Sequence, residues 1–433
     1  MSRVLSADWV LPVEGPPIAD GAVVLEEGRI AAVGPRAELG EGERFDGAAI
    51  LPGLVNAHTH LEYAVYAGFG DGLPFGPWLA LHIERKARIG WEEFLAIARL
   101  GAAECLRSGV TTVADASFSG AAAVAASELG LRALVGLEVF GSDVERLAAV
   151  EERRRELEPE LDGAVVLGVS PHAPYSVSAD LYRAVLAADG GRPVITHVAE
   201  SDDEVGYLLR GEGPIALVSE VPPPGTTPVR HLAREGLLGP SLLAAHCVKV
   251  DEEEITLLAE HDVAVAHCPR SNALLGCGIA PLAELRAAGV RVGLGTDSPA
   301  STPSFDMFEE LRTTVFAARA RAASPDALSA ETALELATLG SAGALGLDAE
   351  TGSLAPGKRA DLAVVSLAGS PYLPWEDPAA AVVFGGSPDR VELTLVAGEE
   401  RYRKGTTAWH ELRRRAERSR LRLLGAQPPA PKT

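Results

Sequence analysis

The chain alternates apolar, strand-like runs with stretches of helical periodicity, and this alternation restricts its fold more than any other feature. Eight such runs fall within roughly 250 residues. They are Ala48–Leu61, Val110–Ser117, Leu131–Phe140, Val165–His172, Val194–Val198, Leu242–Val248, Val263–Cys268 and Val290–Asp297. Eight strand–helix units predict an α/β fold with a (β/α)₈ barrel of the TIM type. A doubly wound open sheet is the alternative, but no glycine-rich phosphate loop follows the early strands.

Both ends of the chain are rich in short strands and turns. Ala22–Leu25 and Arg29–Val33 are strand-like near the start, and Val391–Ala397 is strand-like near the end. We therefore expect residues 1–50 and 352–406 to form one small β domain, a β-sandwich, beside a barrel of residues 51–351. Residues 407–433 are expected to form a C-terminal helix and, after Gln427, a disordered tail.

Composition limits the partners of the chain. Of its 433 residues 47% are hydrophobic and 23% are charged, as in an ordinary globular enzyme. The net charge of -21 argues against a nucleic-acid partner or an anionic membrane, because no basic stripe is present to neutralise phosphates. The basic run Arg413–Arg422 is the exception, and we interpret it as a solvated C-terminal helix.

The cysteines indicate a reducing compartment. Cys105, Cys247, Cys268 and Cys277 form no regular framework, so we expect buried, unreactive thiols and a cytoplasmic protein. No signal-peptide pattern and no apolar run of ~18 residues is present. We therefore expect neither secretion by that route nor a membrane span.

Histidines gather at the ends of the predicted strands. Six of the ten do so: His58, His60, His172, His197, His246 and His267. Taken alone, His58-Thr-His60 is better explained as two histidines that fall near one strand end. Functional groups of such barrels collect at the C-terminal ends of the strands, however, so six histidines there predict a site. The other four, interpreted as surface or packing residues, are His82, His231, His261 and His410.

Four of these strand-end residues form a set of metal ligands. His58, His60, His197 and Asp297 offer three nitrogens and one oxygen to a divalent ion, which leaves an open position for water. Such an ion lowers the pKa of its water to ~7. For Asp297 the alternative is a turn-forming residue before Ser-Pro. The fourth run offers no lysine to bridge a second ion, which favours a single metal.

Two further residues are candidates for proton transfer. Glu200 follows His197 by three residues and could carry protons between water and substrate. Its alternative role is an acid at a helix start, but Ser201 and Glu204 form a capping box for that helix and leave Glu200 free. His246 is either a core histidine or an electrostatic partner of the metal-bound oxygen, and its neighbours favour the second.

With these residues in view, the chain resembles the amidohydrolase superfamily from roughly Val4 to Thr406. The resemblance lies in the branch of mononuclear aminohydrolases that contains cytosine, guanine and adenosine-type nucleoside deaminases. The matching motifs are Pro52-Gly-Leu-Val-Asn-Ala-His58-Thr-His60, Ser170-Pro-His172-Ala-Pro174, Thr196-His197-Val-Ala-Glu200, Ala245-His246-Cys-Val248, His267-Cys-Pro-Arg270-Ser-Asn272, Gly295-Thr-Asp297-Ser298 and Pro356-Gly-Lys-Arg-Ala-Asp-Leu362.

The resemblance implies a role for each matching residue. His58, His60, His197 and Asp297 would bind one divalent ion, zinc in the first place and iron as the alternative. Asp297 would take a proton from the metal-bound water, and Glu200 would protonate the ring nitrogen and help the amine to leave. His246 would orient the attacking oxygen, and His172 would contact the substrate. Because members are often dimers, a homodimer is also implied.

The substrate motif departs from the family in one place. Methylthioadenosine and S-adenosylhomocysteine deaminases usually have Trp-Leu followed by Pro-x-Glu, whose glutamate holds ribose hydroxyls. Trp78-Leu79 is present here, but the Pro-x-Glu is missing, and neither Glu62 nor Glu84 matches the motif. The chain looks most similar to aminodeoxyfutalosine deaminases of menaquinone synthesis. Arg270 is therefore predicted to pair with the benzoate carboxylate of that substrate.

The resemblance, together with these site residues, implies a metal-dependent aminohydrolase that removes the 6-amino group of an adenine nucleoside through a metal-bound hydroxide. Its substrate would belong to the aminodeoxyfutalosine, methylthioadenosine, S-adenosylhomocysteine or deoxyadenosine class. The predicted substrate contacts are His172, Glu62, Trp78 and Arg270.

Three alternatives stay open. The first is a guanine, cytosine or pterin deaminase. The second is a hydrolase for another leaving group, such as chloride or an amide. The third is an inactive barrel, which predicts missing ligands, and none is missing. The glycine-rich loop Tyr66–Trp78 is either a lid or an ordinary mobile loop.

Overall fold

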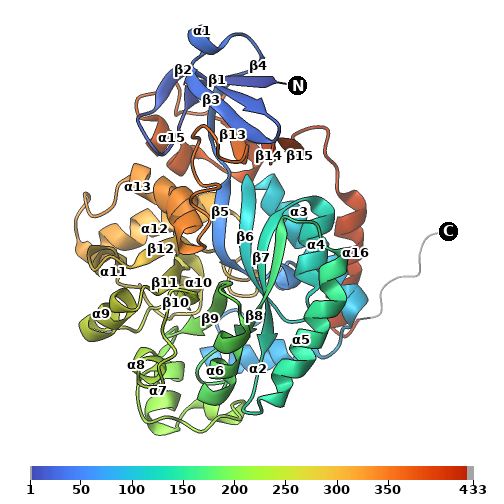
Figure 1. Cartoon of the computed structure of the whole chain (residues 1–433), viewed down its shortest axis with the longest axis vertical. Coiled ribbons are helices and arrows are strands. Elements are labelled where there is room, and N and C mark those ends of the chain that lie inside the picture. The colour runs from blue at the N-terminus through green and yellow to red at the C-terminus, as the bar shows by residue number, and fades with distance from the viewer. Residues whose placement is uncertain (1, 427–433) are drawn as a thin grey trace, which may run out of the picture.

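The computed structural model describes residues 2–426, which form a barrel and a small sheet built from both chain ends (Figure 1). The small sheet is mixed and has the strand order β15-β14-β13-β4-β1-β2-β3. Its strands are β1 Arg3–Val10, β2 Ile18–Glu26, β3 Arg29–Pro35, β4 Glu43–Pro52, β13 Leu362–Ser366, β14 Val391–Val396 and β15 Glu399–Arg403. The strands expected to form a sandwich thus lie in one continuous sheet. Strands from both ends of the chain share its apolar core, which includes Leu5, Val23 and Leu395.

The barrel consists of two parallel four-stranded sheets, β5-β6-β7-β8 and β12-β11-β10-β9. Its strands are β5 Leu54–Thr59, β6 Val110–Ser117, β7 Arg132–Val139, β8 Val165–Pro171, β9 Val194–Val198, β10 Leu242–His246, β11 Ala264–His267 and β12 Arg291–Leu294. Small apolar side chains from strands around the ring, such as Ala57, Ala116 and Ala266, form the inner cluster that fills it. The predicted α/β barrel is confirmed.

Single backbone contacts close the barrel at two seams. Between β12 and β5, the N–H of Asp297 donates to the carbonyl of His58 at 2.9 Å. Between β8 and β9, the N–H of His197 donates to the carbonyl of His172 at 2.8 Å. Both seams therefore lie at residues that the sequence places in the site.

The first predicted run is divided between the small sheet and the barrel. Its first part belongs to β4, which pairs with β1 and β13, and its second part is β5, which pairs with β6. Gly53 lies at the division. A Cβ at Gly53 would come within 2.1 Å of the hydroxyl oxygen of Thr111, so only glycine fits this crossing.

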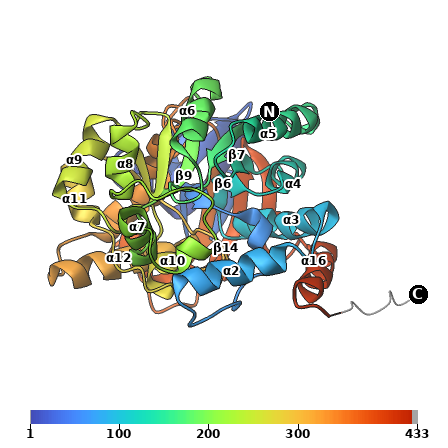
Figure 2. The ribbon, with the colours of Figure 1, turned by 90° about the horizontal axis from the view of Figure 1, so that it is seen from below.

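Helices connect most of the strands along the outside of the barrel. The helices are α1 Arg36–Leu39, α2 Phe75–Lys86, α3 Trp91–Arg107, α4 Ala121–Leu129, α5 Glu145–Leu157, α6 Ala179–Ala188, α7 Asp202–Arg210, α8 Pro228–Arg234, α9 Glu252–Glu260, α10 Pro269–Leu274, α11 Leu282–Ala287, α12 Met307–Ala322, α13 Ala330–Glu335, α14 Ser341–Ala344, α15 Pro378–Gly385 and α16 His410–Leu423. The helix α2 is an addition to the strand–helix alternation. It lies at the end of the barrel away from the small sheet (Figures 1 and 2).

The basic run predicted to form a solvated helix is α16, which packs against α3. Arg413 and Arg422 pair there with Glu104 and Glu93. Arg420 is instead half-buried, and its guanidinium donates to the backbone carbonyls of Val65 and Ala67. One residue of the run therefore holds the loop that precedes α2. The tail predicted after Gln427 lies outside the described residues.

All four cysteines are free and buried, which confirms the prediction of buried thiols. None of the helices within residues 2–426 combines the length and the apolar character that a membrane span requires.

Candidate active site

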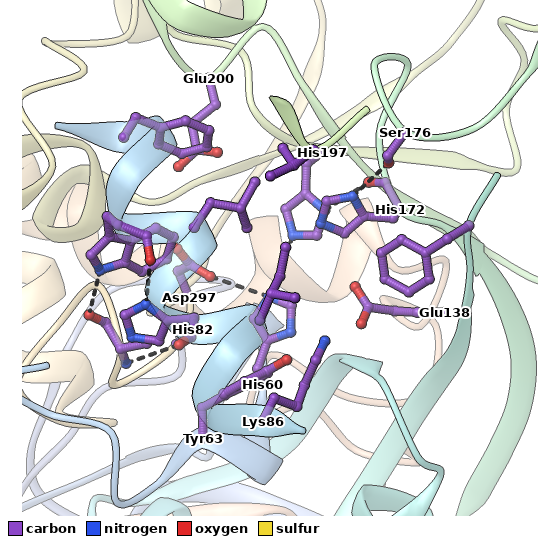
Figure 3. Close-up of a pocket in the computed structure, with 18 of the residues that line it drawn as sticks. His60, Tyr63, His82, Lys86, Glu138, His172, Ser176, His197, Glu200 and Asp297 are labelled. Carbon is purple, nitrogen blue, oxygen red and sulfur yellow. Dashed lines mark hydrogen bonds and ion pairs between the residues drawn. The ribbon is translucent and has the colours of Figure 1, made fainter. Parts of the chain in front are cut away.

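A cavity of about 920 Å³, part of it open to solvent, lies at the C-terminal ends of the barrel strands. His60, His197, His246 and Asp297 line it from four different strand ends, and Glu200 lines it from the turn after β9 (Figure 3). Residues of the helix α2, among them Phe75, Trp78 and Lys86, form another wall. The cavity thus lies where a TIM barrel places its functional groups.

Three imidazoles and one carboxylate converge in this cavity. The Nε2 atoms of His60 and His197 are 3.3 Å apart. Oδ1 of Asp297 lies 3.3 Å from Nε2 of His60 and 3.5 Å from Nε2 of His58. The four predicted ligands are therefore brought to one point.

Hydrogen bonds behind the ligands fix their orientation. Nδ1 of His60 donates to the carbonyl of Ala116 at 2.7 Å, and Nδ1 of His197 donates to the carbonyl of His172 at 2.7 Å. These bonds leave the Nε2 lone pairs directed at the shared point, as in protein metal sites. Oδ2 of Asp297 accepts hydrogen bonds from the hydroxyls of Ser271 and Ser301 at 2.6 and 2.7 Å, which leaves Oδ1 for the histidines.

The donor set fits a divalent cation. Both ring nitrogens of His58 are buried and have no hydrogen-bond partner among the described residues. An unsatisfied buried polar atom costs about 1–3 kcal/mol, and coordination of Nε2 to a cation would offset part of that cost. Ligand atoms of His58, His60 and His197 lie within 4.8 Å of one another, as do those of His58, His246 and Asp297. The residues present therefore form a site for a divalent metal ion.

The pKa values of the predicted ligands show where a proton binds in this site. Burial lowers the pKa of His58 to about 4. Burial opposes protonation of His60 too, but the adjacent Asp297 outweighs it and raises the pKa of His60 to about 9. Burial alone would raise the pKa of Asp297, whereas His58 and His60 hold it well below its usual value. Without a cation, the site thus keeps a proton between His60 and Asp297.

The backbone at these strand ends adopts an uncommon conformation. Ala199, His246 and Asp297 have φ values of 54, 78 and 57°, in the left-handed region that side chains other than glycine rarely adopt. The register of β5 against β6 also shifts between Asn56 and Thr59, as in a β-bulge. Such strained positions cluster at functional sites, where the surrounding structure enforces them.

Glu200 is held in place through its backbone. The carboxylate of Glu204 accepts the N–H groups of Ala199 and Glu200 at 3.1 and 2.7 Å. Ser201 caps α7 as predicted, but Glu204 does not return to the N–H of Ser201, so the predicted capping box is wrong in that half. The prediction that Glu200 is free of the cap agrees with this geometry.

The side chain of Glu200 faces His246. Its Oε1 lies 3.7 Å from Nε2 of His246, whose Nδ1 contacts Oδ1 of Asn272 at 3.0 Å. Burial raises the pKa of Glu200 well above its usual value. The carboxyl of Glu200 therefore keeps its proton to a higher pH than an exposed glutamate does, which suits a general acid beside the predicted ligands.

Two predicted substrate contacts lie away from the cavity. Arg270 is buried against α12, where it pairs with Glu310 and, at 2.6 Å, with Glu309, and it donates to the carbonyl of Ser304 at 2.7 Å. Its guanidinium is thus already occupied by acidic and carbonyl oxygens. The prediction that Arg270 binds a substrate carboxylate is wrong in this structure.

Glu62 is also a structural residue. Its buried carboxylate accepts the N–H groups of Ser119 and Ala121 at 3.0 and 2.9 Å and the hydroxyl of Ser119 at 2.8 Å. It therefore fixes the turn between β6 and α4, and the prediction of a substrate contact is wrong for the same reason.

Trp78 and His172 do line the cavity. Nε1 of Trp78 donates to the carbonyl of Ala300 at 3.3 Å, and Nδ1 of His172 contacts the hydroxyl of Ser176 at 2.7 Å. Their substrate-binding roles stay predictions. His267 lies at a strand end as predicted, but it is buried and is not among the residues that line the cavity.

The lining residues that the sequence did not predict include His82, Lys86 and Glu138. His82, interpreted as a surface or packing residue, is buried against Tyr66 and Trp78 and in addition lines the cavity from α2. Glu138 carried a usable signal, because it is an acidic residue near the C-terminal end of an apolar run. His82 and Lys86 carried none, since α2 lies outside the strand pattern.

Comparisons with known proteins agree with this geometry. The sequence profile of the amidohydrolase family matches residues 49–401. A 5'-deoxyadenosine deaminase of Methanothermobacter thermautotrophicus is 36% identical over 411 residues, which cover 91% of this chain and 93% of that one. A 5-methylthioadenosine/S-adenosylhomocysteine deaminase of Moorella thermoacetica is 36% identical, covering 92% and 94%. The crystal structure of an adenosine deaminase from Xanthomonas campestris with bound zinc superposes with a TM-score of 0.86, at 32% identity and 98% coverage of both chains.

Proposed function

The chain belongs to the amidohydrolase family, and we propose that it is a metal-dependent aminohydrolase that releases ammonia from C6 of an adenine nucleoside. One observation carries the proposal. A buried carboxyl, that of Glu200, lies 3.7 Å from His246 at the edge of a site with three imidazoles and one carboxylate. Relatives that are 36% identical over most of their length and are named for adenine nucleosides support the choice of substrate.

Zinc is the ion that we propose for His58, His60, His197 and Asp297. Three imidazoles and one carboxylate are a typical zinc donor set, and the structural relative from Xanthomonas campestris contains zinc. The bound ion would polarise water in its open position and lower the pKa of that water to ~7.

The side chains of the chain then divide the proton transfers. Oδ1 of Asp297 takes a proton from the attacking water as its oxygen bonds to C6 of the purine. Glu200 gives its proton to N1, because the attack at C6 moves the π electrons of the C6=N1 double bond onto N1. His246, positioned by Asn272, holds the oxygen at C6. The proton taken by Asp297 passes to the amino group, and the C6–N bond to that group breaks, so that ammonia leaves. The C6 hydroxyl then becomes a carbonyl, and its proton returns to Glu200.

The nature of the 5' substituent follows from the polar contacts. Because Arg270 is paired with Glu309 and Glu310, its guanidinium is not free to bind the carboxylate of a benzoate-bearing nucleoside. We therefore propose 5'-deoxyadenosine, methylthioadenosine and adenosine as the first substrates, ahead of aminodeoxyfutalosine. The free, buried cysteines support a reducing compartment, and we propose the cytoplasm. The homodimer stays a prediction.

An ammonia-release assay with zinc-loaded protein tests this function. We expect turnover of 5'-deoxyadenosine, methylthioadenosine or adenosine, with conversion of the adenine to hypoxanthine visible in the ultraviolet. Guanine, cytosine and a chlorotriazine serve as comparison substrates for the alternative activities. Turnover of those compounds without turnover of any 6-aminopurine nucleoside would overturn the proposal.

A further inference from the structure

Two charged side chains line the cavity without a polar partner. Glu138 lies near the end of β7, and Lys86 ends α2 (Figure 3). Within residues 2–426, neither side chain forms a hydrogen bond or an ion pair. We call these two residues the distal wall. Since an unpaired charge in a buried place is costly, such a pair indicates groups that await a ligand.

Strand geometry directs Glu138 into the cavity. Leu134 of β7 belongs to the apolar cluster inside the barrel, and Glu138 follows it by four residues, which places it on the same face of the strand. An oxygen of Glu138 lies within 4.8 Å of ring nitrogens of His172 and His197. The carboxylate therefore stands beside the metal ligands, and Figure 3 shows it away from Glu200.

Aromatic rings, rather than an acid, hold Lys86. Its Nζ lies 3.6 Å from the ring centre of Phe118 and 5.7 Å from that of Phe140. Such cation–π contacts orient the ammonium and leave its three N–H donors free. The distal wall thus offers one charged acceptor and one charged donor to the same cavity (Figure 3).

Glu138 is also the acid best placed to replace the missing Pro-x-Glu. Glu62 is fully occupied by the turn between β6 and α4. Glu84 is exposed on α2 and pairs with Arg88 at 2.5 Å. Of these three glutamates, Glu138 is the one that lines the cavity.

We propose that Glu138 and Lys86 bind the 2'- and 3'-hydroxyls of the nucleoside ribose, an inference that rests on the proposed function. A carboxylate only accepts hydrogen bonds and an ammonium only donates them, whereas each hydroxyl does both. A vicinal diol can therefore donate to Glu138 and accept from Lys86 at the same time. This chain takes its sugar-binding carboxylate from strand β7 instead of the segment after Trp78-Leu79, and the substrate is a riboside with both hydroxyls free.

Adenosine and 2',3'-dideoxyadenosine form the test pair, since they differ only in this diol. The wild-type protein is expected to prefer adenosine in kcat/KM by about 100-fold or more, because hydrogen bonds to charged groups are the strong ones. Glu138→Gln should lower kcat/KM for adenosine by about 10- to 100-fold and leave the value for the dideoxy compound nearly unchanged. Lys86→Met should act in the same direction with a smaller loss. Glu84→Gln is the matched control and should keep the wild-type preference.

Each outcome decides the proposal. A wild-type protein that treats both nucleosides alike would overturn it without any variant. Equal losses on both substrates in Glu138→Gln would indicate a general structural role and overturn it too. If Lys86→Met lowers kcat/KM only for a 5'-carboxylated adenosine, then Lys86 binds an anion, and the proposal that it binds the ribose hydroxyls is wrong. If no nucleoside is deaminated, the proposed function fails, and calorimetric binding of inosine against 2',3'-dideoxyinosine to the wild type and to Glu138→Gln then tests the diol site separately.

Discussion

The two sides of the cavity differ in how their polar groups are satisfied. On the metal side, His60, His197 and Asp297 are each held from behind by carbonyl or hydroxyl groups. On the distal wall, Glu138 and Lys86 have no such support within the part of the chain that the structure describes. The side chains that carry out the reaction must be positioned to within a fraction of an ångström, and the protein fixes them before the substrate binds. The side chains of the distal wall gain their polar contacts only when the substrate binds. The difference separates residues that set the reaction from residues that set the substrate.

Removal of a metal ligand should have the largest effect. His197→Ala deletes one imidazole of the site, so we expect loss of bound metal and a fall in kcat/KM of at least about 10³-fold, since a catalytic ion supplies several kcal/mol. Elemental analysis of the purified protein and the ammonia assay measure both. His261→Ala, at an exposed position after α9, is the control and should change neither quantity. Full activity of His197→Ala would show that the ion lies elsewhere.

Glu200→Gln should remove the proton donor and leave the metal in place. General acid catalysis contributes about 10²–10⁴-fold, and we expect a loss of that size in kcat with unchanged metal content. Glu204→Gln acts only through the backbone of Ala199 and Glu200, so its loss should be smaller. Metal content and kcat separate them from a ligand variant, because only Glu200→Gln removes the carboxyl that gives its proton to the substrate. If Glu200→Gln lost its metal in proportion to its activity, the residue would be a ligand and not the acid.

Arg270→Met tests the correction made to the substrate site. It leaves the buried Glu310 without its guanidinium, and breaking a buried ion pair destabilises a protein by about 3–5 kcal/mol. We expect that loss in denaturant unfolding and an unchanged KM for every substrate that turns over. The double variant Arg270→Met, Glu310→Gln should recover part of the stability. A raised KM with unchanged stability would restore Arg270 to the substrate site.

The barrel and the metal site could be predicted from the sequence because strand periodicity fixes both. Parallel strands place their C-terminal ends together, so His60, His197 and Asp297 meet although they are far apart in the chain. The division of the first run at Gly53 could not be predicted, since it depends on the close approach of Thr111.

Contacts made by side chains outside this pattern were also beyond the sequence. Arg270 belongs to a motif that follows a strand, but its partners Glu309 and Glu310 lie on a helix further along the chain, and no periodicity predicts that pairing. His82 and Lys86 line the cavity from α2, a helix that begins inside the predicted loop Tyr66–Trp78 and that no strand or motif marks in the sequence. The sequence thus predicts the reaction better than the substrate.

Metal binding should depend on pH through the proton that His60 shares with Asp297. With the pKa of His60 raised to about 9, the free site is protonated at pH 7, and an incoming cation must displace that proton. The apparent association constant for zinc should therefore rise by about tenfold per pH unit from pH 7 and level off above the pKa. Competition with a chelating dye measures this slope, and calorimetry in buffers of different ionisation enthalpy counts the released proton. A flat profile between pH 7 and 9 would contradict the shared proton.

The smallest effect should come from a change in α16, the helix that contacts the loop before α2. Arg420 of α16 donates to the carbonyls of Val65 and Ala67 and so holds the loop before α2. The ring centre of Phe69 also lies 4.4 Å from the guanidinium carbon of Arg420 and 3.9 Å from that of Arg85. Arg420→Met should loosen this loop while the metal side stays intact.

Since α2 carries Trp78 and Lys86 into the cavity, we expect KM to rise a few-fold and kcat to change little, because the helix positions the substrate and takes no part in proton transfer. Hydrogen exchange of residues 64–74 should become faster in the same variant. Arg418→Met, on an exposed face of α16, is the matched control and should leave KM and exchange as in the wild type. A large fall in kcat for Arg420→Met would show that the loop before α2 also positions the residues of the metal side. The residues that bind the substrate would then not be independent of those that carry out the reaction.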